Sequence, residues 1–573
     1  MLEARNISLE VDNGEESLLL LNDVNFCVPC GHFMAIVGPS GCGKTTLLKT
    51  IAGIKSATEG TFVWQGRDLS EEGDFEPHEI GYVPQFGIAY EELTVDENIE
   101  NAARLRVKAD SETIDDLIDM ALVMTGLEEI ADRQVKLLSG GQKRRLALAM
   151  ELVAEPRILL CDEVTSGLDP RSEREIVQLL HDLSRNTGCI VISVTHSLEQ
   201  IHLYDSVMVM VQGNLAYHGS PSAMQHYFSV EDVKDVYPRL SQREPEEWRV
   251  SWLKHRVFYY QRLEKEHVEK YRSMGTKPPT PRSEEEAPEL PGFFSQFIRL
   301  LKRRLTIFFR DRSQLLLQAL MILIFPVLVA LFADKGQEQL LTISETRGPD
   351  MVQDVQSQQE RAERRARVGS ALSGIVMFEV ILLGLMGSNN ASREVAGERL
   401  IMEKEKFAGM RVPAYVASKA VFLAGLVVVQ SLWMYAFVQF FGEFRGDSSN
   451  LLYFLIMANA AMTSVCFGIS ANCRTADQAS LLCIYLVGFQ LPLSGAVLAL
   501  PDMVNTITQP FVSAYWAWSG SIKGGLNPEE LKAVTGIVQT TFSDATLCSA
   551  VLWGHVVVGL LLAWWGVRRE RWE

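Results

Sequence analysis

The sequence has 573 residues, which is more than one ordinary domain needs and enough to bury a large core. Its formal net charge is −17, of which residues 1–292 carry −20 and residues 293–573 carry +3. A nucleic-acid partner is therefore not expected, because binding a polyanion requires a basic surface.

Residues 1–230 alternate short runs of β-forming residues with helical stretches, which predicts a layered α/β domain. The first residues, MLEARNISLEV, already alternate like a strand and show no secretory signal. We therefore expect this half to stay on the side of the membrane where it is made. The predicted strands lie at residues 7–11, 32–37, 158–161, 189–194 and 206–211.

The nine cysteines are scattered along the chain, and Cys27 and Cys30 alone mimic a CxxC motif. No second pair accompanies them, so buried reduced thiols are the first interpretation and a metal or redox site is the alternative. Four of the nine, at positions 466, 473, 483 and 548, lie in or near the apolar segments of the second half.

A phosphate-binding loop is predicted directly after the apolar run FMAIV. The loop reads GPSGCGKT, which fits the pattern GxxxxGK[ST], and it continues into the helical stretch TLLKTIAG. In such a loop the backbone amides cradle phosphates, Lys44 offsets their charge, and Thr45 offers a hydroxyl to Mg²⁺. The nucleotide-binding residues predicted here are Gly38, Pro39, Ser40, Gly41, Cys42, Gly43, Lys44, Thr45 and Thr46.

A second glycine-rich loop and an acidic pair follow further along the chain. LSGGQ, at residues 138–142, precedes a helical run, so its glycines let backbone N–H groups approach an anion. The apolar run at 158–161 ends in Asp162 and Glu163. A carboxylate pair at the end of a central strand suits a magnesium ligand and a general base. We assign Asp162 to the metal and Glu163 to the base; a second structural carboxylate is the alternative for Glu163.

These motifs resemble those of ATP-binding cassette (ABC) ATPases. LSGGQ, ILLCDE and SGLD are similar to the signature, Walker B and D-loop motifs of that family. The phrase DEVTSGLDP and the basic run after LSGGQ also resemble the White-type G subfamily of ABC transporters, although Val164 stands where that subfamily usually has proline. The resemblance implies an ATPase that uses ATP and Mg²⁺.

The resemblance also implies roles for residues outside the motifs already described. Gln85, in GYVPQF, would contact Mg²⁺ and take part in catalysis, and His196, after IVISVT, would contact the γ-phosphate. Asp169, in SGLD, would couple two ATP sites. The signature loop would close the ATP site of a second subunit. This loop adds Ser139, Gly140, Gly141 and Gln142 to the nucleotide-binding residues. The aromatic residue on which the family often stacks adenine is absent from residues 1–25.

The second half is predicted to cross a membrane. Residues 231–291 are charged and non-periodic, which indicates an exposed linker. Residues 293–312 then place arginines opposite an apolar stripe, as in an amphipathic helix at a cytoplasmic membrane surface. Six apolar segments follow, each long enough to span; buried helices of a soluble core are the alternative. The segments are 315–333, 371–387, 416–441, 451–470, 479–500 and 549–565.

Charged and polar residues near these spans carry further expectations. Basic residues flank the first and last spans, which predicts a cytoplasmic ATPase domain and two cytoplasmic termini, although arginines in the connection at 334–369 disagree. Residues 392–419 resemble a White-type cytoplasmic segment that passes movement to the spans. Glu379 would handle substrate or protons, or form an interhelical hydrogen bond. Gln430, Gln490 and Asn459 would line a cavity or join helices.

We therefore predict an α/β P-loop NTPase (ABC ATPase) domain at 1–230, a charged linker at 231–291, and an all-α six-helix transmembrane domain at 292–573. The resemblance implies a homodimer, an integral membrane protein with membrane lipids as partners, and ATP-driven export of a hydrophobic or amphipathic substrate such as a lipid, sterol or drug-like molecule. The alternatives are an exporter of lipid-linked glycan or polymer and a membrane-anchored regulatory ATPase that transports nothing.

Overall fold

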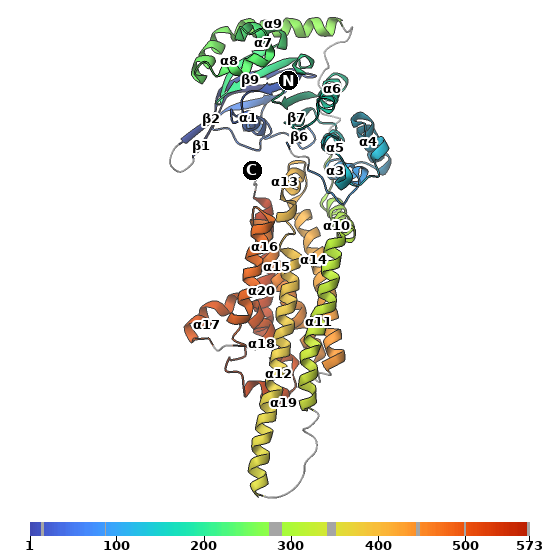
Figure 1. The fold of residues 1–573 in the computed structure, drawn as a ribbon, viewed down its shortest axis with the longest axis vertical. Helices are drawn as coiled ribbons and strands as arrows, with labels where there is room; N and C mark the ends of the chain where they lie inside the picture. Colours follow the sequence, from blue (N-terminus) through green and yellow to red (C-terminus); the bar gives the residue numbers. More distant parts are fainter. Residues whose placement is uncertain are drawn as a thin grey trace. The chain divides into compact units, whose positions relative to one another are not determined.

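The structure is a computed structural model, and the chain divides into two compact units that we describe separately (Figure 1). The first unit comprises Met1–Gly292 and Lys404–Met410, and the second comprises Phe293–Glu403 and Arg411–Arg571. The residues that the structure describes are 1–12, 17–85, 88–273, 289–340, 351–442, 447–497 and 500–569.

The first unit is built on two β-sheets. Its strands are β1 Leu2–Asp12, β2 Ser17–Val28, β3 Phe33–Val37, β4 Glu59–Trp64, β5 Arg67–Asp68, β6 Ile80–Val83, β7 Ile158–Asp162, β8 Ile190–Val194, β9 Ser206–Val211 and β10 Asn214–Gly219. The smaller sheet has the order β2-β1-β4-β5 and is antiparallel. The larger has the order β10-β9-β3-β8-β7-β6, in which the five strands from β9 to β6 are parallel.

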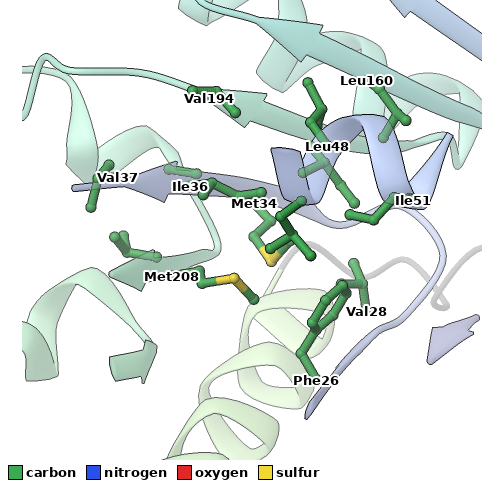
Figure 2. Packing of buried hydrophobic residues seen from close by; sticks show 14 of the residues in the cluster. Phe26, Val28, Met34, Ile36, Val37, Leu48, Ile51, Leu160, Val194 and Met208 are labelled. Carbon is green, nitrogen blue, oxygen red and sulfur yellow. The ribbon is translucent and has the colours of Figure 1, made fainter. Parts of the chain in front are cut away.

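The central strands are buried along their whole length, as expected for a parallel sheet covered on both faces. Figure 2 shows Leu48 and Ile51 from the first helix gathered with Met34 and Ile36 from β3 and Phe26 from β2. The helices of this unit are α1 Lys44–Ile51, α2 Leu69–Glu72, α3 Val95–Arg106, α4 Ser111–Thr125, α5 Gly140–Leu152, α6 Pro170–Thr187, α7 Pro221–Phe228, α8 Val236–Leu240 and α9 Pro245–Ser273. This arrangement confirms the predicted α/β fold class.

The segment after residue 230 differs from the predicted exposed connector. It contains α8 and the long helix α9, on which Trp248 and Trp252 are each only 2% exposed. Trp252 packs edge-on against Tyr217 of β10, and Trp248 packs against Phe228 of α7. Tryptophans four residues apart share one helix face and bury a large area, which the charged residues around them conceal in the sequence. The Pro-rich part of the predicted linker, at 274–288, lies outside the described residues.

The cysteines of both units are free thiols. Cys27 on β2 is exposed, while Cys30 and Cys473 are partly covered and the other six are buried. Within the described ranges no group of three or more His, Cys, Asp or Glu side chains is placed to hold a metal ion. Cys27 and Cys30 therefore have no further ligands there to complete a metal site.

The second unit is helical. Its elements are α10 Phe293–Arg310, α11 Arg312–Leu340, α12 Met351–Ala391, α13 Arg399–Phe407, α14 Val412–Gly442, α15 Ser448–Asn472, α16 Ala476–Leu493, α17 Asp502–Thr508, α18 Ser513–Gly525, α19 Pro528–Thr535 and α20 Ala545–Arg568. Helix α13 belongs to this unit only as far as Glu403. In the described part of the chain, six helices are long and apolar enough to cross a membrane. They lie at 312–331, 365–407, 412–440, 448–472, 476–493 and 545–568, one for each predicted span.

Several element ends differ from the predicted spans. Helix α11 continues to Leu340 and α12 already begins at Met351, so much of the predicted 334–369 connection is helical. The fifth span ends earlier, at Leu493. The short buried helix α18 was not predicted, because it is too short to resemble a span. Its glycine at 520 lies so close to α15 that an added Cβ would come 2.3 Å from the Phe454 ring.

Helix α10 buries two of its basic side chains and leaves part of its apolar stripe exposed. Arg303 and Arg304 are buried, whereas Phe294 is 75% exposed. The Arg304 guanidinium donates two hydrogen bonds to Glu394, at 2.6 and 2.8 Å, and Lys419 Nζ lies 3.0 Å from the same carboxylate. This paired carboxylate explains why arginine can be buried, since a buried charge is tolerated where it has charged partners. The exposed face also carries Ile298, Leu305 and Phe309.

Four polar side chains, which we call the amide cluster, join four of the candidate spans: Gln318 of α11, Asn390 of α12, Gln430 of α14 and Asn459 of α15. Each is at most 4% exposed. Gln318 donates to Asn390 at 2.7 Å, Asn390 donates to Gln430 at 2.9 Å, and Gln430 donates back to Gln318 at 2.9 Å. Asn459 donates to Gln430 at 3.2 Å. Gln430 and Asn459 therefore join helices here, as one of the two sequence interpretations expected.

The other two polar residues singled out in the spans behave differently from each other. Gln490 at the end of α16 accepts hydrogen bonds from the Ser513 hydroxyl at 3.2 Å and the Ala514 N–H at 3.0 Å, and so caps α18. Glu379 of α12 is 2% exposed, and its carboxylate has no hydrogen-bond partner among the residues that the structure describes. The interhelical hydrogen bond considered for Glu379 is thus not observed.

Replacing the central member of the amide cluster should loosen the helical unit. Gln430→Leu leaves three buried amides short of partners, which costs about 1–3 kcal/mol. We expect a lower midpoint of thermal unfolding for the detergent-solubilised protein, while Val429→Leu, at an exposed neighbouring position, should leave the midpoint unchanged. Equal midpoints for both variants would show that the cluster does not hold these helices together.

Candidate functional site

The register of the larger sheet places the predicted site residues at one edge. In the parallel pairs, Ile36 of β3 and Asp162 of β7 both lie opposite Val194 of β8, and Val83 of β6 lies opposite Cys161. These strands therefore end side by side. Each is followed at once by a predicted site segment, and the carboxyl edge of a parallel sheet is where α/β proteins bind ligands.

The phosphate loop connects β3 to α1 with the backbone that its glycines permit. Gly43, the residue before α1, has φ of 102°, and an added Cβ would come 2.9 Å from the carbonyl oxygen of Leu20. Lys44 is 5% exposed, and its ammonium donates to the carbonyl oxygens of Gly38 at 3.0 Å and Pro39 at 2.9 Å. The loop thus forms a close-fitting cradle at a helix N-terminus, a place where phosphate is favoured.

Asp162 and Thr45 meet at the end of β7. The Thr45 hydroxyl donates to Asp162 Oδ1 at 2.9 Å, and the Tyr82 hydroxyl donates to Oδ2 at 3.4 Å. Burial raises the pKa of Asp162, and the neighbouring Glu163 acts in the same direction, while the Thr45 hydrogen bond lowers it. A cation would relieve this desolvated carboxylate. The hydroxyl and carboxylate oxygens are ligands of the kind that Mg²⁺ prefers, so the residues fit that ion.

Glu163 is held by two other predicted site residues. Gln85 Nε2 donates to Glu163 Oε2 at 2.8 Å, and His196 Nε2 lies 2.7 Å from Oε1. The backbone of Glu163 has φ of 48°, and its N–H donates to the Val194 carbonyl at 3.1 Å. Such left-handed conformations of residues other than glycine are uncommon and concentrate at functional sites.

The signature loop and Asp169 each form the N-terminal cap of a helix, at α5 and α6. Ser139 and Gln142 form a capping box at the start of α5, with hydrogen bonds of 3.3 and 3.0 Å. Asp169 caps α6 by accepting from the N–H groups of Arg171 and Ser172. In the described part of the chain, none of the hydrogen bonds or ion pairs joins residues 139–142 or Asp169 to residues 38–46.

Tyr82 is a site residue that the sequence did not reveal. It lies on β6, is 2% exposed, and has the only side chain besides Thr45 for which the described residues show a hydrogen bond to Asp162. Because Tyr82 lies inside an apolar strand, the sequence indicates only that its side chain packs in the core. Only the pairing of β6 with β7 shows that its hydroxyl reaches the acidic residue.

Comparison with known proteins places this geometry in a family. The profile of the family described as ABC transporter matches residues 21–166, and the profile described as ABC-2 type transporter matches residues 295–517. The first covers the phosphate loop, Gln85, the signature loop and the acidic pair. The second covers α10 to α16 and part of α18.

Individual relatives agree with these matches. The ABC transporter ATP-binding/permease protein Rv1747 of Mycobacterium tuberculosis is 27% identical over 91% of this chain and 57% of its own length. The spermidine/putrescine import ATP-binding protein PotA of Haemophilus influenzae is 37% identical over 35% of this chain and 54% of its own length. This chain therefore spans little more than half the length of these two relatives.

Two further comparisons concern the first unit alone. The sulfate/thiosulfate import ATP-binding protein CysA of Pectobacterium atrosepticum is 31% identical over 40% of this chain and 70% of its own length. The structure of the ATP-binding cassette MJ0796 in a dimeric post-hydrolysis state is 29% identical over 38% of this chain and 98% of its own, with a TM-score of 0.35. The 31% identity over 70% of the CysA protein shows that the chain belongs to the ABC transporter family, and the two profile matches show an N-terminal ATPase unit followed by a membrane domain of the ABC-2 type.

Proposed function

We propose that this chain is one half of an ATP-driven exporter of a hydrophobic or amphipathic substrate, with its ATPase unit and both termini in the cytoplasm. One observation carries the proposal. Five predicted site residues are hydrogen-bonded in two groups at one sheet edge, Thr45 with Asp162 and both Gln85 and His196 with Glu163, and Lys44 follows in the phosphate loop next to Thr45. The described part of the same chain also has six candidate spans. Export is proposed from the ABC-2 type of the membrane domain.

The contacts of these residues support a division of labour in hydrolysis. Lys44 would turn from the loop carbonyls to the β- and γ-phosphates of ATP, and Thr45, Asp162 and Gln85 would hold Mg²⁺. When bound, that ion neutralises charge that develops on the phosphate oxygens. Glu163 would orient and deprotonate the attacking water, as a general base. Gln85 and His196, which hold both oxygens of Glu163, would fix the direction of its carboxylate.

Removing the base should separate ATP binding from hydrolysis. In Glu163→Gln the phosphate loop is intact, so we expect ATP affinity close to wild type and hydrolysis slower by about 10²- to 10⁴-fold, the usual contribution of a general base. Affinity is measured with a fluorescent ATP analogue and turnover by phosphate release from lipid-reconstituted protein. Glu128→Gln, at an exposed position of the same unit, is the control. Turnover near wild type in Glu163→Gln would contradict the assignment of Glu163 as the general base.

We also propose that two copies of the chain form the complete ATPase. The signature loop has no hydrogen bond to the phosphate loop of its own chain in the described residues, and its first glycine is open: an added Cβ at Gly140 would meet nothing within 4 Å. Every motif needed for ATP hydrolysis is present in this chain. A homodimer would therefore have two equivalent composite sites, and no partner of different sequence is needed.

Mixing two inactive chains tests this arrangement. Lys44→Ala damages the phosphate loop, and Gly141→Asp puts a carboxylate on the signature loop, where an added Cβ comes no closer than 3.7 Å to its own chain. Each homodimer should be inactive, while a purified mixed dimer keeps one of two composite sites and should regain ATPase activity. Mixed dimers of two Lys44→Ala chains carrying different tags are the control. Complete inactivity of the purified dimer that pairs a Lys44→Ala chain with a Gly141→Asp chain would refute the shared site.

A cavity in the second unit supports a small amphipathic substrate. It has a volume of about 610 Å³, within the range of small-molecule pockets, and lies between α12, the end of α16 and the segment before α20. Its wall combines the apolar Met377, Phe378 and Ile381 with the hydroxyls of Ser373 and Thr540. This size favours a lipid, sterol or drug-like molecule over a lipid-linked glycan or polymer.

Filling the cavity should weaken the response to substrate. Gly374 lines the cavity and an added Cβ there would meet nothing within 4 Å, so Gly374→Leu extends into open space. ATPase activity is measured in liposomes against sterols, phospholipids, drug-like amphiphiles and lipid-linked glycans. We expect a lower ratio of stimulated to unstimulated activity than in Gly425→Leu, an equally open helical glycine outside the cavity. Stimulation by glycans alone, or by none of these compounds, would favour one of the two alternative functions.

A further inference from the structure

Tyr237 places its hydroxyl between two loops of the ATP site. It comes from α8, in the segment whose composition predicted an exposed linker. The hydroxyl donates to the backbone carbonyl of His196 at 3.2 Å, and it lies near enough to the backbone of Gly38 for that backbone to act on the pKa of the hydroxyl. One side chain from outside the ATPase motifs therefore touches both the loop after β8 and the first residue of the phosphate loop.

The two backbone segments near the Tyr237 hydroxyl are each linked to a side chain of the proposed chemistry. The ring of His196 lies 2.7 Å from Glu163, and the carbonyl of Gly38 accepts from the ammonium of Lys44 at 3.0 Å. The hydroxyl of Tyr237 thus joins the backbone that carries the partner of the base to the backbone that carries the phosphate-binding lysine. Its exposure is intermediate, and its ring packs against the main hydrophobic core.

The helix that carries Tyr237 is firmly anchored. Its neighbours Val236 and Leu240 are at most 1% exposed, and the indole N–H of Trp248 donates to the Leu240 carbonyl at 3.1 Å. Trp248 belongs to the aromatic cluster that fixes α9 to β10 and α7. Burial raises the pKa of Tyr237 to about 12, so its hydroxyl keeps the proton that it donates throughout the neutral range.

We propose that Tyr237 is a positioning residue for ATP hydrolysis, which holds the His196 backbone at a fixed place relative to the phosphate loop. A ring that only filled space in the core would not need a hydroxyl. The hydroxyl is needed because it alone makes the two backbone contacts. This inference rests on the catalytic role proposed for His196, and the experiment below separates the two.

The first test removes the hydroxyl and keeps the ring. For the full-length chain in liposomes, we expect Tyr237→Phe to lower kcat about 3- to 10-fold, the effect of one hydrogen bond, with a smaller change in KM for ATP. Tyr227→Phe is the matched control, because that hydroxyl bonds to Ser251 at 3.1 Å inside the same aromatic cluster and touches neither loop. Equal kcat in wild type and Tyr237→Phe, or an equal loss in Tyr227→Phe, would overturn the proposal.

A double-mutant cycle provides the second test, measured by single-turnover hydrolysis. If Tyr237 acts through His196, Tyr237→Phe should have no further effect in a His196→Ala background, whereas a general loss of stability would lower both backgrounds equally. An undiminished effect in that background would overturn the inference. If His196→Ala itself leaves hydrolysis unchanged, the proposed role of His196 fails. If His196→Ala is slow while Tyr237→Phe matches wild type, only the inference about Tyr237 fails.

Discussion

The ATP site depends on the parallel register of β3, β6, β7 and β8. These strands are neighbours in one sheet and end at the same edge, so four loops from distant parts of the sequence meet there without any need for long side chains. The uniformly buried strands fix that register, because sliding β3, β7 or β8 would shift its hydrogen bonds to two neighbours, and sliding β6 would shift its bonds to β7. The apolar core of the first unit is in this sense the support of the catalytic geometry.

The conformation of Glu163 depends on this arrangement of strands. Its backbone adopts a left-handed conformation that costs of the order of 1–3 kcal/mol and persists only where the surroundings impose it. Here the N–H of Glu163 is tied to β8 through Val194, and both carboxylate oxygens have partners. Three contacts from the ends of two strands, β6 and β8, thereby hold the backbone and the carboxylate of Glu163. In our proposal, the anchored Tyr237 holds the backbone of His196 in a similar way.

The sequence predicted what is local and missed what depends on contacts between distant residues. The phosphate loop, the acidic pair and the six spans are continuous stretches with strong patterns, and the structure has each of them. Helix α9 was missed because its buried tryptophans stand among charged residues, and α18 because it is short. The joining of helices by Gln430 and Asn459 was one of two interpretations, but Tyr82 and the other two members of the amide cluster, Gln318 and Asn390, could not be inferred, since hydrogen bonds between distant strands or spans leave no spacing in the sequence. The burial of Arg304 likewise depends on a carboxylate ninety positions away.

The distribution of thiols has a practical consequence for spectroscopy. Of the nine free cysteines, only Cys27 is exposed, and it lies on β2 of the first unit. A maleimide-linked spin label or fluorophore should therefore attach preferentially at one position per chain without prior mutagenesis. In a dimer this yields a single label-to-label distance, which would report directly how far the two ATPase units separate during the catalytic cycle.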